Sequence, residues 1–318
     1  MAPGLTPEDI REAVRRFRDP AVPVAGRGGV GSVKVIAVRG RPVAIKRVDG
    51  WDAREARRRA AGERGRMAML LQLVPSVAPR TTVLPLRLTL AAPGRFVALR
   101  AADAVAVIAD HAGDARLLGR AFAMLADAAA AMMGKGVFHN DIKPENVLVF
   151  DGREPVLSDF DGMQVLDHPE YAGVSTVTPF YCSRIPRDDD HMFVGERAPL
   201  RPLLPEVRPG QDGPGSASRV LEFWDTDVTW EKMARLNLYT LATSAASLGL
   251  AEWEDAFLDL CALTALGLRP SVLERRVEDG LRGLARRPPP TVIRTSAGGR
   301  RRDAPAWMMR SARRPARR

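Results

Sequence analysis

The chain has 318 residues, of which 46% are hydrophobic and 27% charged, with two cysteines and a formal net charge of +10. A chain of this size and apolar content can bury one or two cores, which excludes a disordered polymer and a disulfide-dependent mini-protein. Cys182 and Cys261 cannot form a disulfide framework, nor a four-ligand zinc site without histidine ligands. We expect a globular protein of a reducing compartment.

The first residues lack both the basic start and the apolar core of a secretory signal, and the sequence has no run of about 18 apolar residues. We therefore expect a soluble intracellular protein without a membrane span. Its compartment would be the cytoplasm or the nucleus, of a host cell if the chain is viral.

The positive charge is concentrated at the C-terminus. Residues 281–318 contain twelve arginines and one acid, Asp303, whereas the other 280 residues hold 36 basic and 37 acidic side chains. Prolines at 288–290 and the Gly298-Gly299 pair interrupt any helix, so we expect residues 286–318 to form a disordered basic tail. Such a block of charge attracts any polyanion, so the tail could bind nucleic acid, an acidic partner or a membrane surface.

A helix is predicted within residues 1–19. Thr6 is a suitable N-cap, Pro7 suits the first turn, and Asp19-Pro20 ends the segment. The apolar residues at helical spacing, which we expect to share one face, are Ile10, Val14 and Phe17.

Strands are predicted next. Residues 33–38 and 42–48 have the pattern of a hairpin, and residues 51–73 have the composition of a helix with arginines outside. Leucines alternate at positions 84, 86, 88 and 90 before Pro93-Gly94, which predicts a further strand.

Helices dominate after about residue 104. A long Ala-rich helix is predicted over 117–133, ended by Gly134 and Gly136, and a hairpin is predicted from 147–150 and 156–158. The sequence therefore predicts an α+β protein with a small β-rich N-terminal lobe, about 20–100. A larger, mainly helical C-terminal lobe would span about 104–285, with a flexible insertion at 187–219.

A glycine-rich run lies between two predicted strands. It reads Gly26-Arg27-Gly28-Gly29-Val30-Gly31-Ser32-Val33 and fits the pattern G-x-G-x-x-G-x-V. Glycines let backbone N–H groups approach phosphates, and the final valine can cover an adenine ring. Taken alone, the run is equally consistent with a glycine-rich hairpin turn. A Rossmann turn would need a helix here, where a strand is predicted.

A lysine ends the next apolar strand, Val43-Ala44-Ile45-Lys46. A mostly buried lysine needs an anionic partner, which phosphate oxygens and a helix carboxylate can provide. Glu63, in the middle of the following helix, is the preferred carboxylate, and Glu55 is the alternative. Either glutamate alone is also compatible with a solvated helix face.

Two polar segments surround the predicted hairpin at 147–158. The first, His139-Asn140-Asp141-Ile142-Lys143-Pro144-Glu145-Asn146, places a base, an ammonium and an amide within one loop. The second, Ser158-Asp159-Phe160-Asp161-Gly162, follows a strand, where a carboxylate can coordinate Mg²⁺ beside a nucleotide.

In this order, the four segments resemble those of the eukaryotic-type protein kinases, in the branch specific for serine and threonine. The resemblance covers about residues 20–285 and implies the two-lobed fold of that family. It implies phosphoryl transfer from ATP, with Mg²⁺ or Mn²⁺ as the metal, to a protein substrate.

The resemblance also assigns nucleotide-binding roles. The glycine-rich segment would cover the phosphates, and Lys46, paired with Glu63, would hold the α and β phosphates. The residues of this nucleotide-binding surface are Gly26, Gly28, Gly29, Val30, Gly31, Val33, Ala44, Lys46 and Glu63.

The two loop segments would carry the reaction itself. By resemblance, Asp141 orients the substrate hydroxyl and accepts its proton, and Lys143 neutralises the transferred phosphoryl group. Asn146 and Asp159 would bind the metal. Weaker similarities occur at Thr178-Pro179, at residues 237–241 and at residues 268–271.

The sequence departs from the family pattern at four places. Asn140 replaces an arginine that binds a phosphorylated activation loop, so activity need not depend on such phosphorylation. Asp161 replaces a glycine and adds charge near the metal. Asn237 replaces a bracing aspartate, although its amide oxygen can still accept hydrogen bonds. Ser183-Arg184-Ile185 replaces Ala-Pro-Glu, which removes the usual partner of Arg269.

Two alternatives remain open. Asp161, Ile185 and Asn237 are compatible with a pseudokinase that acts as a nucleotide- or partner-binding scaffold. A small-molecule kinase of the same fold also has a His-x-Asp loop, but residues 143–146 and Thr178-Pro179 favour a polypeptide substrate.

Overall fold

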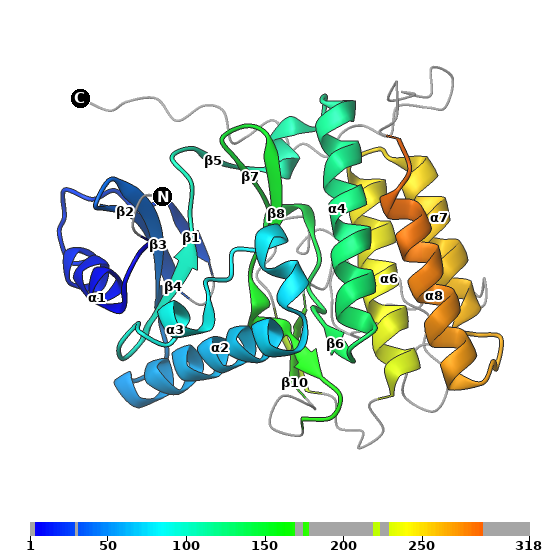
Figure 1. The fold of residues 1–318 in the computed structure, drawn as a ribbon, viewed down its shortest axis with the longest axis horizontal. Coiled ribbons are helices and arrows are strands. Elements are labelled where there is room, and N and C mark those ends of the chain that lie inside the picture. The colour runs from blue at the N-terminus through cyan, green and yellow to red at the C-terminus, as the bar shows by residue number, and fades with distance from the viewer. Residues whose placement is uncertain (1–3, 29–30, 169–173, 178–218, 223–228, 289–318) are drawn as a thin grey trace.

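The computed structural model describes residues 4–28, 31–168, 174–177, 219–222 and 229–288. In these residues the fold is of mixed α+β type (Figure 1). Antiparallel sheets characterise the N-terminal part, and the C-terminal part is mainly helical. No helix in the described ranges is both long and apolar enough to cross a bilayer.

Helix α1, Pro7–Arg16, confirms the first predicted helix. Its start is a capping box, in which Thr6 Oγ1 accepts a hydrogen bond from the Asp9 backbone N–H and the Asp9 carboxylate accepts one from the Thr6 N–H at 2.7 Å. Arg15 and Arg16 lie in the last turn, where positive charge is favoured by the helix dipole.

A four-stranded antiparallel sheet follows, with the strands in the order β1-β2-β3-β4. The hairpin between β2 and β3 confirms the predicted one, and its turn residues Arg39 and Gly40 both have positive φ, as tight hairpins require. The strands are β1 Gly26–Gly28, β2 Gly31–Val38, β3 Arg41–Val48 and β4 Phe96–Arg100.

Helix α1 covers one face of this sheet. Ile10 and Val14 of α1 pack in one core with Ile36 and Ile45 of the sheet, and Figure 1 shows α1 beside β2 and β3. Since successive side chains of a strand point to opposite faces, Lys46 lies on the face turned away from α1.

The prediction of a strand from the leucines at 84–90 is wrong. Residues Leu86–Thr89 form a short helix, α3, and Leu86 and Leu90 are exposed. The spacing of Leu84 and Leu88 also fits one helical turn, and the Thr89 hydroxyl donates to the Leu84 carbonyl at 2.7 Å. The strand in this part of the chain is β4, after the Pro93-Gly94 turn.

The predicted helix over 51–73 is confirmed as α2, Ala53–Leu73, which Asp52 caps through the Glu55 N–H. Met67 and Leu70 are buried in the main core. Glu63, in the middle of the helix, is also buried. A 3₁₀ helix, η1 Pro75–Arg80, continues the chain after α2.

Four long helices build most of the C-terminal part. Figure 1 shows them gathered at the end of the molecule opposite α1, and their core includes Phe122, Trp253 and Phe257, whose rings lie 5.9–6.3 Å apart. The predicted helix over 117–133 is confirmed as the first of them. They are α4 Ala115–Met133, α6 Trp230–Ser247, α7 Ala251–Leu263 and α8 Pro270–Ala285.

Short strands and 3₁₀ helices lie between the sheet and these helices. The predicted hairpin at 147–158 is confirmed, and it pairs with β5 in a three-stranded sheet. The strands are β5 Val105–Val107, β6 Val137–Phe138, β7 Val147–Phe150, β8 Glu154–Leu157, β9 Gln164–Val165, β10 Val174–Val177 and β11 Arg219–Glu222. The 3₁₀ helices are η2 Ile108–His111, η3 Pro144–Asn146 and η4 Phe160–Gly162.

Several expectations fall outside the described residues. They concern Cys182, Thr178-Pro179, Ser183-Arg184-Ile185, the insertion at 187–219 apart from its last residue, and the tail beyond residue 288.

We expect α1 to contribute to the stability of the sheet. Replacing the fully buried Ile10 by Ala should lower the free energy of unfolding by about 2–5 kcal/mol, because a cavity would form between α1 and the sheet. The control is Arg11→Ala, an exposed position on the same helix. Equal denaturation midpoints for the two variants would show that α1 is not part of the folded core.

Candidate active site

Three carboxylates surround the ammonium group of Lys46. Its Nζ lies 2.9 Å from Asp161 Oδ2, 3.1 Å from Glu63 Oε1 and 3.5 Å from Asp159 Oδ1. The expected pairing with Glu63 is therefore present, whereas Glu55 binds Arg58 and Arg59 of its own helix. We refer to Lys46, Glu63, Asp159 and Asp161 as the lysine cluster.

The lysine cluster joins three elements of the fold. Lys46 comes from β3, Glu63 from the middle of α2, and Asp159 and Asp161 flank Phe160 at the start of η4. Helix α2 contacts both β3 and η4. The Glu63 side chain is only 3% exposed, whereas that of Asp159 is 37% exposed and accessible to a ligand.

The cluster sets the charges of its members. Burial alone would lower the pKa of Lys46, but the charges of Glu63, Asp161 and Asp159 raise this pKa well above its usual value. Burial and the neighbouring Asp161 raise the pKa of Glu63 well above normal. Burial would likewise raise the pKa of Asp161, but the Lys46 ammonium outweighs it and lowers this pKa. Lys46 and Asp161 therefore form a charged pair, and Glu63 takes up a proton most readily.

The glycine-rich segment lies next to this cluster. Gly28 pairs with Gly31 between β1 and β2, and Gly29 and Val30, predicted to contact phosphate, are outside the described residues. A Cβ at Gly31 would lie 1.9 Å from the Arg47 carbonyl oxygen. The pairing of β2 with β3 thus itself requires glycine at position 31.

Val33 and Ala44 lie on the same face of the sheet as Lys46. Val33 is the direct partner of Lys46 across β2 and β3, and Ala44 precedes Lys46 by two residues in β3. Both arrangements place the side chains on one face. An apolar surface therefore adjoins the ammonium group.

The loop before β7 holds a second set of polar residues. Lys143 Nζ lies 2.8 Å from Asp141 Oδ2, and Asn146 Nδ2 donates to the same oxygen at 3.1 Å and to the Asp141 carbonyl at 2.8 Å. All three side chains are buried. We refer to Asp141, Lys143 and Asn146 as the loop cluster, and its hydrogen bonds fix the orientation of the Asp141 carboxylate.

Asn237 of α6 supports this loop through hydrogen bonds. Its Oδ1 accepts hydrogen bonds from the backbone N–H groups of His139 at 3.1 Å and Asn140 at 3.0 Å, which confirms that the amide can replace a carboxylate here. Its Nδ2 donates to Asn140 Oδ1 at 2.7 Å and to the Met233 carbonyl at 2.9 Å. The amide therefore uses both its oxygen and its nitrogen.

His139 connects the loop to the segment that carries Asp159. Its Nδ1 accepts from the Asp141 N–H at 3.3 Å, so its Nε2, 3.0 Å from the Ser158 carbonyl, is the donor. Its ring also meets the Phe160 ring edge to face, with centroids 4.7 Å apart. Burial lowers the pKa of His139, which keeps the ring neutral and this arrangement intact.

Two residues of these segments have left-handed backbone conformations. Asn140 has φ of 65° and Asp159 has φ of 64°. Asparagine and aspartate tolerate this region better than most residues, but it still costs conformational energy, and such positions concentrate at functional sites. In Asn140 the surrounding bonds offset the strain, since its Nδ2 donates to the Gly162 carbonyl and to Gln164 Oε1.

The structure thus brings together the side chains predicted for chemistry. Glu63, Asp159 and Lys46 meet in one cluster, and Asp141, Lys143 and Asn146 meet in the other. Ser158 links the clusters, because its N–H and hydroxyl both donate to the Asn146 carbonyl. The contact between Asp161 and Lys46 was not predicted from the sequence, although an aspartate where the resembling family has glycine was a signal for it.

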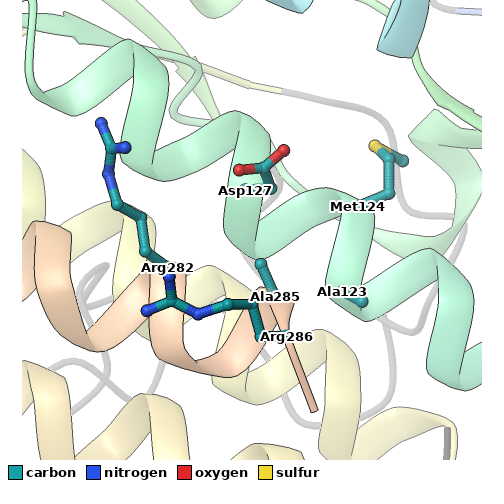
Figure 2. Close-up of a pocket in the computed structure, with 6 residues that line it drawn as sticks. All are labelled: Ala123, Met124, Asp127, Arg282, Ala285 and Arg286. Carbon is teal, nitrogen blue, oxygen red and sulfur yellow. The ribbon is translucent and has the colours of Figure 1, made fainter. Parts of the chain in front are cut away.

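A cavity of about 420 Å³ lies elsewhere, between α4 and α8 (Figure 2). Asp127 on its wall forms an ion pair with Arg80, and Arg282 forms one with Glu278. Its lining residues are Ala123, Met124, Asp127, Arg282, Ala285 and Arg286. It contains no residue of the lysine cluster or of the loop cluster.

No protein-family model matches this sequence, and no curated protein matches it significantly. The function is therefore inferred from the two clusters and their chemistry.

Asn237 should matter for the stability of the loop. Asn237→Ala leaves the buried N–H groups of His139 and Asn140 without an acceptor, and should lower the free energy of unfolding by about 2–4 kcal/mol. Thr243→Ala, which removes one bond to a carbonyl on the same helix, is the control. If chemical denaturation gave the same small loss for both variants, the bracing role of Asn237 would be refuted.

Proposed function

We propose that the chain is an ATP-dependent protein kinase that phosphorylates serine or threonine hydroxyls, built on the two-lobed protein-kinase fold. The observation that carries this proposal is the loop cluster, a buried carboxylate held between an ammonium and an amide. The loop cluster is joined through Ser158 to the lysine cluster. A base and a phosphate-binding cation therefore lie on neighbouring segments, as phosphoryl transfer requires.

Lys46 is suited to binding the α and β phosphates of ATP. Its carboxylate neighbours hold the ammonium in its charged form, and the adjacent Val33 and Ala44 supply an apolar surface for the adenine ring. The structure describes three glycines of the motif. Gly26 and Gly28 lie in β1 and Gly31 lies in β2, and Gly26 pairs with Val33 across these two strands.

Asn146 and Asp159 fit a divalent metal. Among the described residues nothing donates to Asn146 Oδ1, and the Asp159 carboxylate is partly exposed. Carboxylate and amide oxygens are the ligands that Mg²⁺ and Mn²⁺ take in proteins. When bound, the metal would neutralise charge on the phosphates of ATP.

In the proposed reaction, the substrate hydroxyl oxygen forms a bond to the γ-phosphorus of ATP while the bond from that phosphorus to the bridging oxygen breaks. ADP leaves, and the hydroxyl proton passes to Asp141. Asn146 and Lys143 orient the Asp141 carboxylate for this transfer. The Lys143 ammonium, 2.8 Å from the base, also supplies positive charge to the transferred phosphoryl group.

A pseudokinase is the second candidate function. The observation that favours it is the contact of Asp161 with Lys46, since a carboxylate 2.9 Å from the ammonium takes a position that a phosphate oxygen would need. Such a protein would bind partners, or nucleotide weakly, without transferring phosphate.

Asp141→Asn should lower turnover by about 10²- to 10⁴-fold, because the amide cannot accept the hydroxyl proton. The assay is transfer of radioactive γ-phosphate from ATP, with Mg²⁺ or Mn²⁺, to a basic test protein, followed by phosphoamino-acid analysis. Asp167→Asn, an exposed carboxylate in the same region of the chain, is the matched control.

Phosphoserine or phosphothreonine that is lost only in the Asp141 variant supports the proposal. Nucleotide binding without any transfer would instead favour the pseudokinase or a small-molecule acceptor.

Replacing Ser175 and Thr176 together by alanine should leave basal activity largely unchanged. These residues lie in β10, and the loop that carries Asp141 is bound by the amides of Asn140 and Asn237, with asparagine at the position where many kinases have a phosphate-binding arginine. Initial rates of the double variant and the wild type provide the comparison. Collapse of activity in the double variant would mean that phosphorylation of this segment is required.

A further inference from the structure

The contact between Asp161 and Lys46 has a consequence for nucleotide binding. We propose that Asp161 is an internal competitor for the phosphate position at Lys46, so that the site binds nucleotide strongly only together with a divalent cation. This inference rests on the proposed role of Lys46 in binding phosphate. It assigns to Asp161 a part in ligand selection that the other carboxylates of the lysine cluster do not share.

The hydrogen-bonding capacity of Lys46 is already used. An ammonium group has three N–H donors, and three carboxylate oxygens lie within 3.5 Å of Nζ. A phosphate oxygen must therefore displace one of the carboxylates to bind Lys46 directly.

Asp161 is the carboxylate that a phosphate oxygen would have to displace. Glu63 is enclosed within α2 and only 3% exposed, so it cannot withdraw without disturbing the helix. Asp159 is the most distant of the three, at 3.5 Å, and belongs to the proposed metal site. Asp161 makes the shortest contact from the short 3₁₀ helix η4, and it is 17% exposed.

Charge makes this displacement depend on a cation. Even when Glu63 holds a proton, the carboxylates of Asp159 and Asp161 outnumber the Lys46 ammonium, so a bare nucleotide would bring further negative charge close to them. Burial weakens the screening by water and salt. A divalent cation that enters with the nucleotide offsets this repulsion, so that a phosphate oxygen can take the place of the Asp161 carboxylate at Lys46.

The three carboxylates do not require a resident metal of their own. Their oxygens lie within 4.8 Å of one another, but the Lys46 ammonium already contacts all three. Asp161 is therefore assigned here as a competitor for Lys46 and not as a metal ligand.

Two variants distinguish the effect of the Asp161 charge on nucleotide binding from the effect of its side-chain size. Asp161→Asn keeps the shape and removes the charge, and Asp161→Gly removes the side chain at a position without positive φ. The control is Asp167→Asn, which removes an exposed charge nearby. Thermal unfolding of each variant shows whether it is folded.

The measurement is the affinity of the full chain for ADP by calorimetry, once with EDTA and once with Mg²⁺. Both Asp161 variants should bind metal-free ADP at least about tenfold more tightly than the wild type, because one buried repulsive charge is gone. Their affinity for ADP with Mg²⁺ should change less, and the control should behave like the wild type.

Failure of this inference and failure of the proposed function would give different results. Unchanged metal-free affinity in both Asp161 variants would overturn the competitor role, and the proposed function would survive if wild-type protein binds ADP with Mg²⁺. Loss of ADP binding with Mg²⁺ in both variants would instead make Asp161 a ligand. A wild-type protein that binds ADP under neither condition would overturn the proposed function, and this inference with it.

Discussion

A single ammonium group, that of Lys46, holds together three parts of the chain that are far apart in sequence. A charged amine at the end of a buried strand is unfavourable unless carboxylates compensate it, and removal of the Lys46 ammonium would leave its three carboxyl groups without a cation in this cluster. The partners come from α2 and from both sides of Phe160 in η4. The positions of the sheet, of α2 and of η4 are therefore mutually dependent, and a ligand that competes for Lys46 acts on all three elements.

The loop cluster contains one ion pair, between Lys143 and Asp141, but the loop that carries it is held mainly by uncharged groups. The Asn237 amide accepts a hydrogen bond from the Asn140 N–H and donates one to the Asn140 side chain. The Asn140 amide in turn donates hydrogen bonds to the Gly162 carbonyl and to Gln164. Both polar atoms of the Asn140 and Asn237 side chains form hydrogen bonds, whereas the buried Gln164 Nε2 has no partner among the described residues. Buried hydrogen bonds between uncharged groups orient the loop and respond little to salt. The two clusters therefore have different proposed roles. In the proposed function, the loop cluster would hold the base in a fixed orientation, and the lysine cluster would contain the contact that a nucleotide has to change.

Local rules were enough to predict much of the fold. The capping residues around α1, the glycines after α4 and the turn of the β7–β8 hairpin each act within a few residues, so their patterns are legible in the sequence. The leucines at 84–90 led to a wrong prediction of a strand, because their spacing fits both the alternation of a strand and one turn of a helix. The observed burial of only some of these leucines distinguishes the helix from the strand. The partner of Lys46 on α2 was expected from the motif. The contact with Asp161 was not, because it joins residues 115 positions apart through side-chain geometry that no local pattern encodes.

In the proposed function, the glycine-rich sheet face, the lysine cluster and the loop cluster form one nucleotide site. The decisive measurement is amide hydrogen exchange of the full chain, with and without a non-hydrolysable ATP analogue and Mg²⁺. We expect increased protection together in residues 31–35, 139–146 and 158–162, with no change around the cavity between α4 and α8. Protection confined to that cavity, or no change in any of the three segments, would contradict it.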